Sequence, residues 1–135
     1  MKIVSRTFVV IMLGWLLTAC GTPVEDIEAQ KIAASYFEAI KSKNFDRAAS
    51  FYPPEQQEKW QAYLTEAHDK LGDLSSYNIH GIEPSTVYSG KRFIMDVATK
   101  YGDQIAAEVV ILFAHVKTGK ILLESHKISA KGFRK

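Results

Sequence analysis

Four histidines and one cysteine are the side chains of this 135-residue chain best suited to hold a metal ion or to act as nucleophiles. The histidines, His68, His80, His115 and His126, lack the His-x-x-x-His spacing that places two imidazoles on one helix face. No Gly-x-Ser-x-Gly, phosphate-binding loop or dinucleotide-binding fingerprint accompanies them. The sequence therefore predicts no metal site and no cofactor. Only Cys20 has surroundings that indicate a definite chemistry.

Cys20 follows a segment with the features of a signal peptide. Two basic residues precede an apolar stretch from Thr7 to Leu17, which is shorter than the roughly 20 residues that a membrane-spanning helix needs. We therefore expect a signal peptide over residues 1–19. The run Leu17-Thr18-Ala19-Cys20 resembles the lipobox of bacterial lipoproteins. The resemblance implies that Cys20 becomes the first mature residue, carries diacylglycerol on its sulfur and is then N-acylated, for example with palmitate.

Acylation would fix the location of the protein. Two or more acyl chains hold a protein on a membrane almost permanently, whereas one myristoyl chain binds reversibly. Gly21 lacks the acidic character associated with inner-membrane retention in Gram-negative lipoproteins. The resemblance therefore implies the outer membrane, facing the periplasm, and the extracytoplasmic side of the cytoplasmic membrane is the alternative. An ordinary secretory signal with an incidental cysteine is the competing interpretation.

Residues 20–135 have the length of one ordinary domain, which is long enough to bury a hydrophobic core. The chain contains 17 Lys and Arg against 15 Asp and Glu, and two of the basic residues, Lys2 and Arg6, lie in the predicted signal peptide. The rest of the chain therefore has no formal net charge. No block of basic residues interleaved with aromatics indicates nucleic-acid binding. With Cys20 acylated, no disulfide can form within one chain.

Residues 22–72 show the patterns of three helices. A capping box at Thr22–Glu25 precedes apolar residues that recur at helical spacing up to Ile40, so the first helix should end near residues 43–44. Residues 45–52 predict a second, shorter helix. Pro53-Pro54 then opens a third, which Gly72 ends. The expected buried stripe of this third helix is Trp60, Tyr63, Leu64, Ala67 and Leu71.

From Asp73 onward, apolar residues recur with a period close to two, as in β-strands. Three turn signals, Ser89-Gly90, Gly102-Asp103 and Thr118-Gly119, divide this region. The pattern predicts an antiparallel meander of about four strands. Because the helices come first and the strands after, we expect an α+β fold with the helices packed on one face of the sheet.

Two segments, FEAIKSKNFDRAASF and AEVVILFAHVKTGKILLESHKIS, resemble the nuclear transport factor 2-like, or cystatin-like, fold. The resemblance spans most of residues 29–128 and implies a cone, in which helices pack against a curved antiparallel sheet. It also implies dimerisation through the open sheet. Members include isomerases, dehydratases, assembly scaffolds and immunity or transport partners, so the fold alone fixes no function.

The predicted turns assign each strand residue to a face. If Gly102-Asp103 is a two-residue hairpin loop, Tyr101 pairs with Gln104. The face toward the helices should then carry Phe93, Met95, Val97, Glu108, Val110, Leu112, Ile121 and Leu123. The opposite face should carry a candidate interface made of Ile94, Val109, Ile111, Phe113 and Leu122, bordered by Arg92, Asp96, Glu124 and His126.

Residues 109–114 are apolar on both sides of their strand, which indicates that both sides are covered. A second copy of the chain, another envelope protein, a long loop or the C-terminal segment from Ala130 could supply the cover. We favour an interface. The sequence thus predicts a non-enzymatic, membrane-tethered module that binds a homodimer partner or an envelope protein through its sheet face.

The alternative prediction is a small-ligand-binding or isomerase-like cone. The isomerase-like members of the resembled family place an acid and a tyrosine inside the cone, which by resemblance makes Glu108 a candidate general base. Tyr101 and Lys127 would complete this candidate pocket. A salt bridge between Glu108 and Lys127, expected as diagonal neighbours on adjacent strands, would explain both residues without catalysis.

Overall fold

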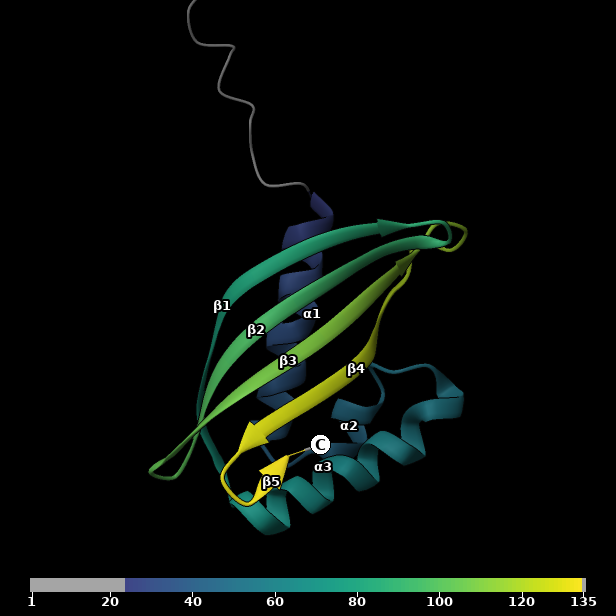
Figure 1. Ribbon diagram of the computed structural model, residues 1–135. Coiled ribbons are helices and arrows are strands. Elements are labelled where there is room, and N and C mark those ends of the chain that lie inside the picture. The colour runs from purple at the N-terminus through teal and green to yellow at the C-terminus, as the bar shows by residue number, and fades with distance from the viewer. Residues whose placement is uncertain (1–23, 135) are drawn as a thin grey trace, which may run out of the picture.

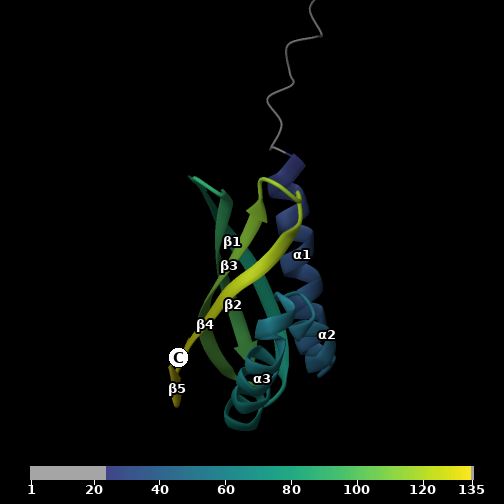
Figure 2. The same ribbon diagram turned by 90° about the vertical axis from the view of Figure 1, so that its right-hand side faces the viewer.

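The fold has two layers, a curved antiparallel sheet and a set of helices that covers its concave face (Figure 1). The structure is a computed structural model and describes residues 24–134, so the predicted signal peptide and Cys20 lie outside the described residues. The strand order is β1-β2-β3-β4-β5. Figure 2 shows the helices on one side of the sheet. The predicted α+β class, with the helices on one sheet face, is confirmed.

The first two helices are joined by a tight turn. Helix α1 spans Val24–Lys41, and Lys43 follows it in the left-handed region with a φ of 60°. Asn44, which we expected near the end of the first helix, instead caps α2 by accepting a hydrogen bond from the backbone N–H of Arg47 at 3.2 Å. Helix α2 spans Phe45–Ala49 and is shorter than predicted. The buried stripe of α1 is Ala29, Ala33, Tyr36, Phe37 and Ile40.

Helix α3 spans Gln57–Leu71 and follows a 3-10 turn, η1, at Pro54–Gln56. Gly72 ends it with a φ of 86°, a conformation that favours glycine. Four of the five residues predicted to face inward, Trp60, Leu64, Ala67 and Leu71, are buried, and Tyr63 is partly buried. The helical pattern of the sequence therefore identified the side of α3 that packs on the sheet.

The four long strands are joined by the three predicted turns. They are β1 (Leu74–Val87), β2 (Gly90–Tyr101), β3 (Gln104–His115) and β4 (Ile121–Ala130). A fifth strand, β5 (Phe133–Arg134), pairs with the end of β4. The expected number of about four strands was thus one too few, because a two-residue strand shows no alternation in the sequence.

The C-terminal segment does not provide the cover that we considered for the outer sheet face. After β4 the chain turns back at Gly132, and Phe133 is buried with its ring centroid 5.6 Å from that of Tyr63 on α3. Up to Arg134, the segment therefore lies along the edge of β4 and packs toward the helices.

The predicted register between β2 and β3 is confirmed. Tyr101 pairs with Gln104, and the pairing continues to the other end of both strands. The side chains expected to face the helices are all buried: Phe93, Met95, Val97, Glu108, Val110, Leu112, Ile121 and Leu123. A single correct hairpin loop therefore assigned the faces of two strands.

Between β3 and β4 a bulge interrupts the alternation. Ile111 pairs with Ser125 and Leu112 pairs with Leu123, which leaves Glu124 as an extra residue. Every later side chain of β4 therefore faces the side opposite to the one predicted from strict alternation. His126, which we expected on the outer face, is only 3% exposed and lies in the core.

Candidate functional site

Glu108 is a buried carboxylate on the inner face of β3. Its Oε2 accepts a hydrogen bond from the Tyr101 hydroxyl at 2.9 Å, and its Oε1 lies 2.5 Å from Nε2 of His126. The side chains of Glu108 and His126 are both completely buried. Because an isolated carboxylate is very unfavourable in an apolar interior, these two donors make the position of Glu108 possible.

The hydrogen bonds continue beyond His126. Its Nδ1 lies 2.7 Å from the Tyr36 hydroxyl, which lies 2.9 Å from the Tyr52 hydroxyl. We call these five side chains, Tyr101, Glu108, His126, Tyr36 and Tyr52, the buried polar network. They come from β2, β3, β4, α1 and the segment that follows α2. The network therefore ties both layers of the fold together.

Every polar side-chain atom of the network has a partner in two arrangements of the protons. With His126 neutral and protonated on Nε2, Tyr52 donates to Tyr36, Tyr36 donates to Nδ1, and Nε2 donates to Glu108. With His126 protonated on both nitrogens, Nδ1 donates to Tyr36 and Tyr36 donates to Tyr52. The Tyr101 hydroxyl donates to Glu108 in both cases.

The three phenols of the network are held in their neutral form. Burial raises the pKa of Tyr36 and of Tyr52 well above the ordinary value of a tyrosine. Burial, and then the charge of Glu108, raise the pKa of Tyr101 as well. The phenols therefore keep their protons and remain hydrogen-bond donors at neutral pH.

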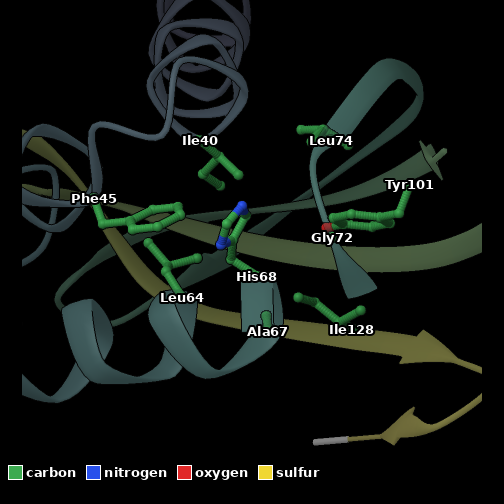
Figure 3. Close-up of a pocket in the computed structure, with 9 residues that line it drawn as sticks. All are labelled: Ile40, Phe45, Leu64, Ala67, His68, Gly72, Leu74, Tyr101 and Ile128. Carbon is green, nitrogen blue, oxygen red and sulfur yellow. The ribbon is translucent and has the colours of Figure 1, made fainter. Parts of the chain in front are cut away.

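The space beside the network is very small. A cavity of about 10 Å³ lies between the helices and the sheet and is lined by Ile40, Phe45, Leu64, His68 and Tyr101, among others (Figure 3). This volume is close to the minimum that one water molecule requires. Tyr101 lines the cavity, whereas Glu108 does not. The arrangement can therefore stabilise the packing of sheet and helices, but this cavity gives an organic substrate no room.

The structure brings together two of the three residues of the candidate pocket. Tyr101 and Glu108 are hydrogen-bonded, which agrees with their predicted positions on the same face of the sheet. Lys127 is exposed and pairs with Val109, so its predicted place beside Glu108 was wrong. The bulge at Glu124 is the physical reason, because it turns Lys127 outward and His126 inward.

Sequence reasoning missed His126 as a partner of the carboxylate and Tyr36 as the partner of His126. One signal was present: Glu108 occupies a position on an otherwise apolar face, and a buried carboxylate requires nearby donors. That requirement identifies the need for partners. It does not identify His126 as the second donor, because the bulge in β4 places His126 on the inner face.

The five residues of the candidate interface lie on the sheet face opposite the helices. They are Ile94 on β2, Val109, Ile111 and Phe113 on β3, and Leu122 on β4, and each is partly buried. The register places Ile94 beside Ile111, and Leu122 beside Phe113. We call the continuous surface that they form the outer apolar strip.

Strand β3 makes the strip apolar from Ile105 to Phe113. Its outward side chains over this length are Ile105, Ala107, Val109, Ile111 and Phe113, and the polar His115 follows at the end of the strand, with its ring centroid 4.5 Å from that of Phe113. Charged residues border the strip on both sides. Across Phe113, Arg92 donates two hydrogen bonds to Glu124, at 2.8 and 3.0 Å. The arrangement of an apolar centre with a charged rim is typical of protein interfaces.

The described part of the chain shows neither a metal site nor a membrane-spanning helix. Within residues 24–134, no group of three or more His, Cys, Asp and Glu side chains is placed to hold a metal ion. In the same part of the chain, no helix combines the length and the apolar character needed to cross a membrane. Comparison of the chain with protein-family models, with curated proteins and with solved structures finds no match.

Proposed function

We propose that the chain is a bacterial lipoprotein, anchored through acyl groups on Cys20, whose domain is a non-enzymatic binding module. Its partner is a second copy of the chain, bound through the outer apolar strip. One observation carries the proposal: the outward side chains of the central strand β3 are all apolar from Ile105 to Phe113, and only His115 at the end of the strand is polar. An antiparallel sheet with one face in water normally shows polar residues on that face. The apolar strip therefore supports the proposal that a partner covers this face of the sheet.

We also assign the fold to the cystatin-like cone and the location to the outer membrane, facing the periplasm. Three helices against the concave face of a long-stranded meander support the first assignment. The run that ends at Cys20, followed by Gly21, supports the second. The extracytoplasmic side of the cytoplasmic membrane is the alternative location.

The charges beside the strip favour one arrangement of two copies. Asp96, Val109 and Lys127 lie at one level across β2, β3 and β4. A two-fold axis parallel to β3 would place β2 of one copy over β4 of the other, so that Asp96 faces Lys127 of the second copy. A two-fold axis that crosses the strands at the level of Asp96 would instead place Arg92 over Lys100 of the second copy. These two positive charges repel each other.

The same axis is consistent with a membrane anchor. Rotation about an axis parallel to the strands leaves the start of α1 at the same end of both copies. Both acylated termini could then enter one bilayer. With an axis across the strands, the two termini would point in opposite directions.

A ligand-binding or isomerase-like cone, with Glu108 as acid or base, is the second candidate function. It requires open space beside the carboxylate. Both oxygens of Glu108 already have partners, and the cavity next to Tyr101 holds about one water molecule. These contacts favour a structural role for Glu108.

The test is a charged residue within the strip. Ile111→Asp should abolish self-association of the acylated full chain while the domain stays folded, because the buried aspartate would have no partner. Ser129→Asp, an exposed outward position of β4 near the end of the strand, is the matched control. Crosslinking in intact cells and sedimentation in detergent measure association.

The outcomes separate the parts of the proposal. If the wild-type chain is a monomer and crosslinks to no envelope protein, the binding function is refuted. If it crosslinks to a different envelope protein and Ile111→Asp abolishes this, the face is correct and the second copy is the wrong partner. If Ile111→Asp associates as the wild type does, the strip is not the interface.

A further inference from the structure

Exposed apolar side chains gather at one end of the domain. Among residues 24–134, the large hydrophobic residues classed as exposed are Ile27, Tyr88, Ile105 and Val116. Three of these four lie where α1 begins: Ile27 in the first turns of α1, Tyr88 in the turn between β1 and β2, and Val116 in the loop between β3 and β4 (Figure 1). Tyr88 is fully exposed and Val116 is 74% exposed.

Specific contacts hold these three segments at the same end. The Lys91 ammonium at the start of β2 lies 3.4 Å from Oδ1 of Asp26 and 3.7 Å from Oε2 of Glu25, both on α1. The backbone N–H of Val116 donates to the carbonyl of Ser89 at 3.1 Å. The first turn of α1 and the two loops therefore form one surface, which we call the anchor-proximal end.

We infer that the anchor-proximal end contacts the phospholipid bilayer and seats the domain on the membrane in a fixed orientation. This inference rests on the proposed acyl anchor at Cys20. Four residue steps separate Cys20 from Val24, the first residue of α1, and four residues span at most about 14 Å. A tether this short keeps the start of α1, and with it both loops, close to the lipid headgroups.

The side chains at this end suit the interface between water and lipid. Tyrosine combines an apolar ring with a polar hydroxyl and is enriched at membrane surfaces. Lys117 and Lys120 are exposed in the same loop as Val116. Their ammonium groups can contact anionic headgroups while the methylene groups of their side chains lie deeper in the bilayer.

A bilayer fits this surface better than a protein partner does. Ile27, Tyr88 and Val116 project from three separate segments. Protein interfaces instead have a closely packed, complementary centre. A fluid interface accepts separate projections without complementary shape.

The experiment measures the distance of two positions from lipid in the acylated full chain. Once Cys20 is acylated, a cysteine introduced at a chosen site is the only free thiol. Val116→Cys and Ile105→Cys provide matched probes, since their native side chains are 74% and 75% exposed and lie at opposite ends of β3. Each variant is labelled with an environment-sensitive fluorophore and reconstituted into phosphatidylethanolamine and phosphatidylglycerol vesicles that contain nitroxide-labelled headgroups. Tyr88→Cys repeats the measurement if Val116→Cys does not fold.

We expect the label at position 116 to be quenched several-fold more strongly than the label at position 105, with its emission shifted to the blue. Equal quenching at both positions, in protein that floats with the vesicles, would overturn the membrane-contacting surface and leave the anchor intact. If Tyr88→Cys is used instead, equal quenching at positions 88 and 105 would likewise overturn the membrane-contacting surface. Failure of the wild-type chain to float with vesicles would instead refute the anchor of the proposed function, and this inference with it.

Discussion

Replacing Glu108 with glutamine tests whether the buried polar network is structural. Glu108→Gln keeps the size of the side chain, but it removes the charge and turns one acceptor atom into an NH₂ donor. Tyr101 and Nε2 of His126 both donate to the carboxylate, and both of these charge-assisted hydrogen bonds are lost in the variant. Neutral His126 must also move its proton to Nδ1, toward Tyr36, before Nε2 can accept from the new NH₂ group.

The expected loss follows from these contacts. A hydrogen bond to a charged group contributes about 1.5–3 kcal/mol, and breaking a buried charged pair removes about 3–5 kcal/mol. Glutamine retains one acceptor, so we expect the free energy of unfolding to fall by about 3 kcal/mol. This is a large part of the roughly 5–15 kcal/mol that stabilises an ordinary domain.

Urea unfolding, followed by Trp60 fluorescence, provides the assay. Trp60 is 6% exposed and stacks on Tyr52, with ring centroids 4.6 Å apart, so unfolding changes its surroundings. Glu83→Gln is the matched control. It makes the same chemical change at an exposed position of β1, outside the residues assigned to the interface, where we expect a change of less than about 0.5 kcal/mol.

One result would refute the reasoning. If Glu108→Gln is as stable as the wild type or more stable, the native carboxylate is held at a net cost in stability, as acids at catalytic sites often are. The isomerase-like alternative would then be favoured. Tyr101→Phe removes one donor without adding another and should lower the free energy of unfolding by about 1–2 kcal/mol.

Three further predictions concern pH, the interface and the anchor. Burial raises the pKa of Tyr63 and of Tyr77 to about 12, above the value of about 10 in an unfolded chain, so the stability that they contribute is complete below about pH 10 and is lost as the pH rises toward 12. The urea midpoint of the wild type should fall between about pH 10 and pH 12, and that of Tyr77→Phe should fall less steeply. An equal fall in the wild type and in Tyr77→Phe would contradict the raised pKa of Tyr77. In the proposed dimer, Asp96→Lys and Lys127→Asp should each weaken association measured by sedimentation, whereas the double variant should restore it; a double variant weaker than both single variants would exclude the two-fold axis along the strands. Labelled palmitate should enter the wild-type chain and not Cys20→Ser, and a wild-type chain that stays unlabelled and soluble would refute the anchor.

The elements that sequence reasoning predicted well are those set by local chemistry. Helix spacing identified the buried side of α3, and the Gly102-Asp103 turn fixed the register of β2 and β3. Both signals involve residues close together in the chain. The side-chain faces of β2 and β3, including the inward position of Glu108, followed directly from them.

The errors come from interactions between distant residues. The bulge at Glu124 depends on how β4 meets β3, and no turn residue in the sequence marks it. Because of the bulge, His126 lies in the core and Lys127 at the surface, so each is on the side of the sheet opposite to the predicted one. The contact between His126 and Tyr36 joins residues 90 positions apart, so no local pattern could indicate it.

The anchor-proximal end also determines which part of the domain reaches furthest from the bilayer. Strands β2 and β3 each contain 12 residues, which corresponds to about 40 Å along the strand. Their connecting hairpin at Gly102-Asp103 lies at the opposite end from the start of α1 (Figure 1). An epitope inserted at that hairpin would therefore stand clear of the headgroups, where an antibody or a protein on the facing side of the envelope could bind it.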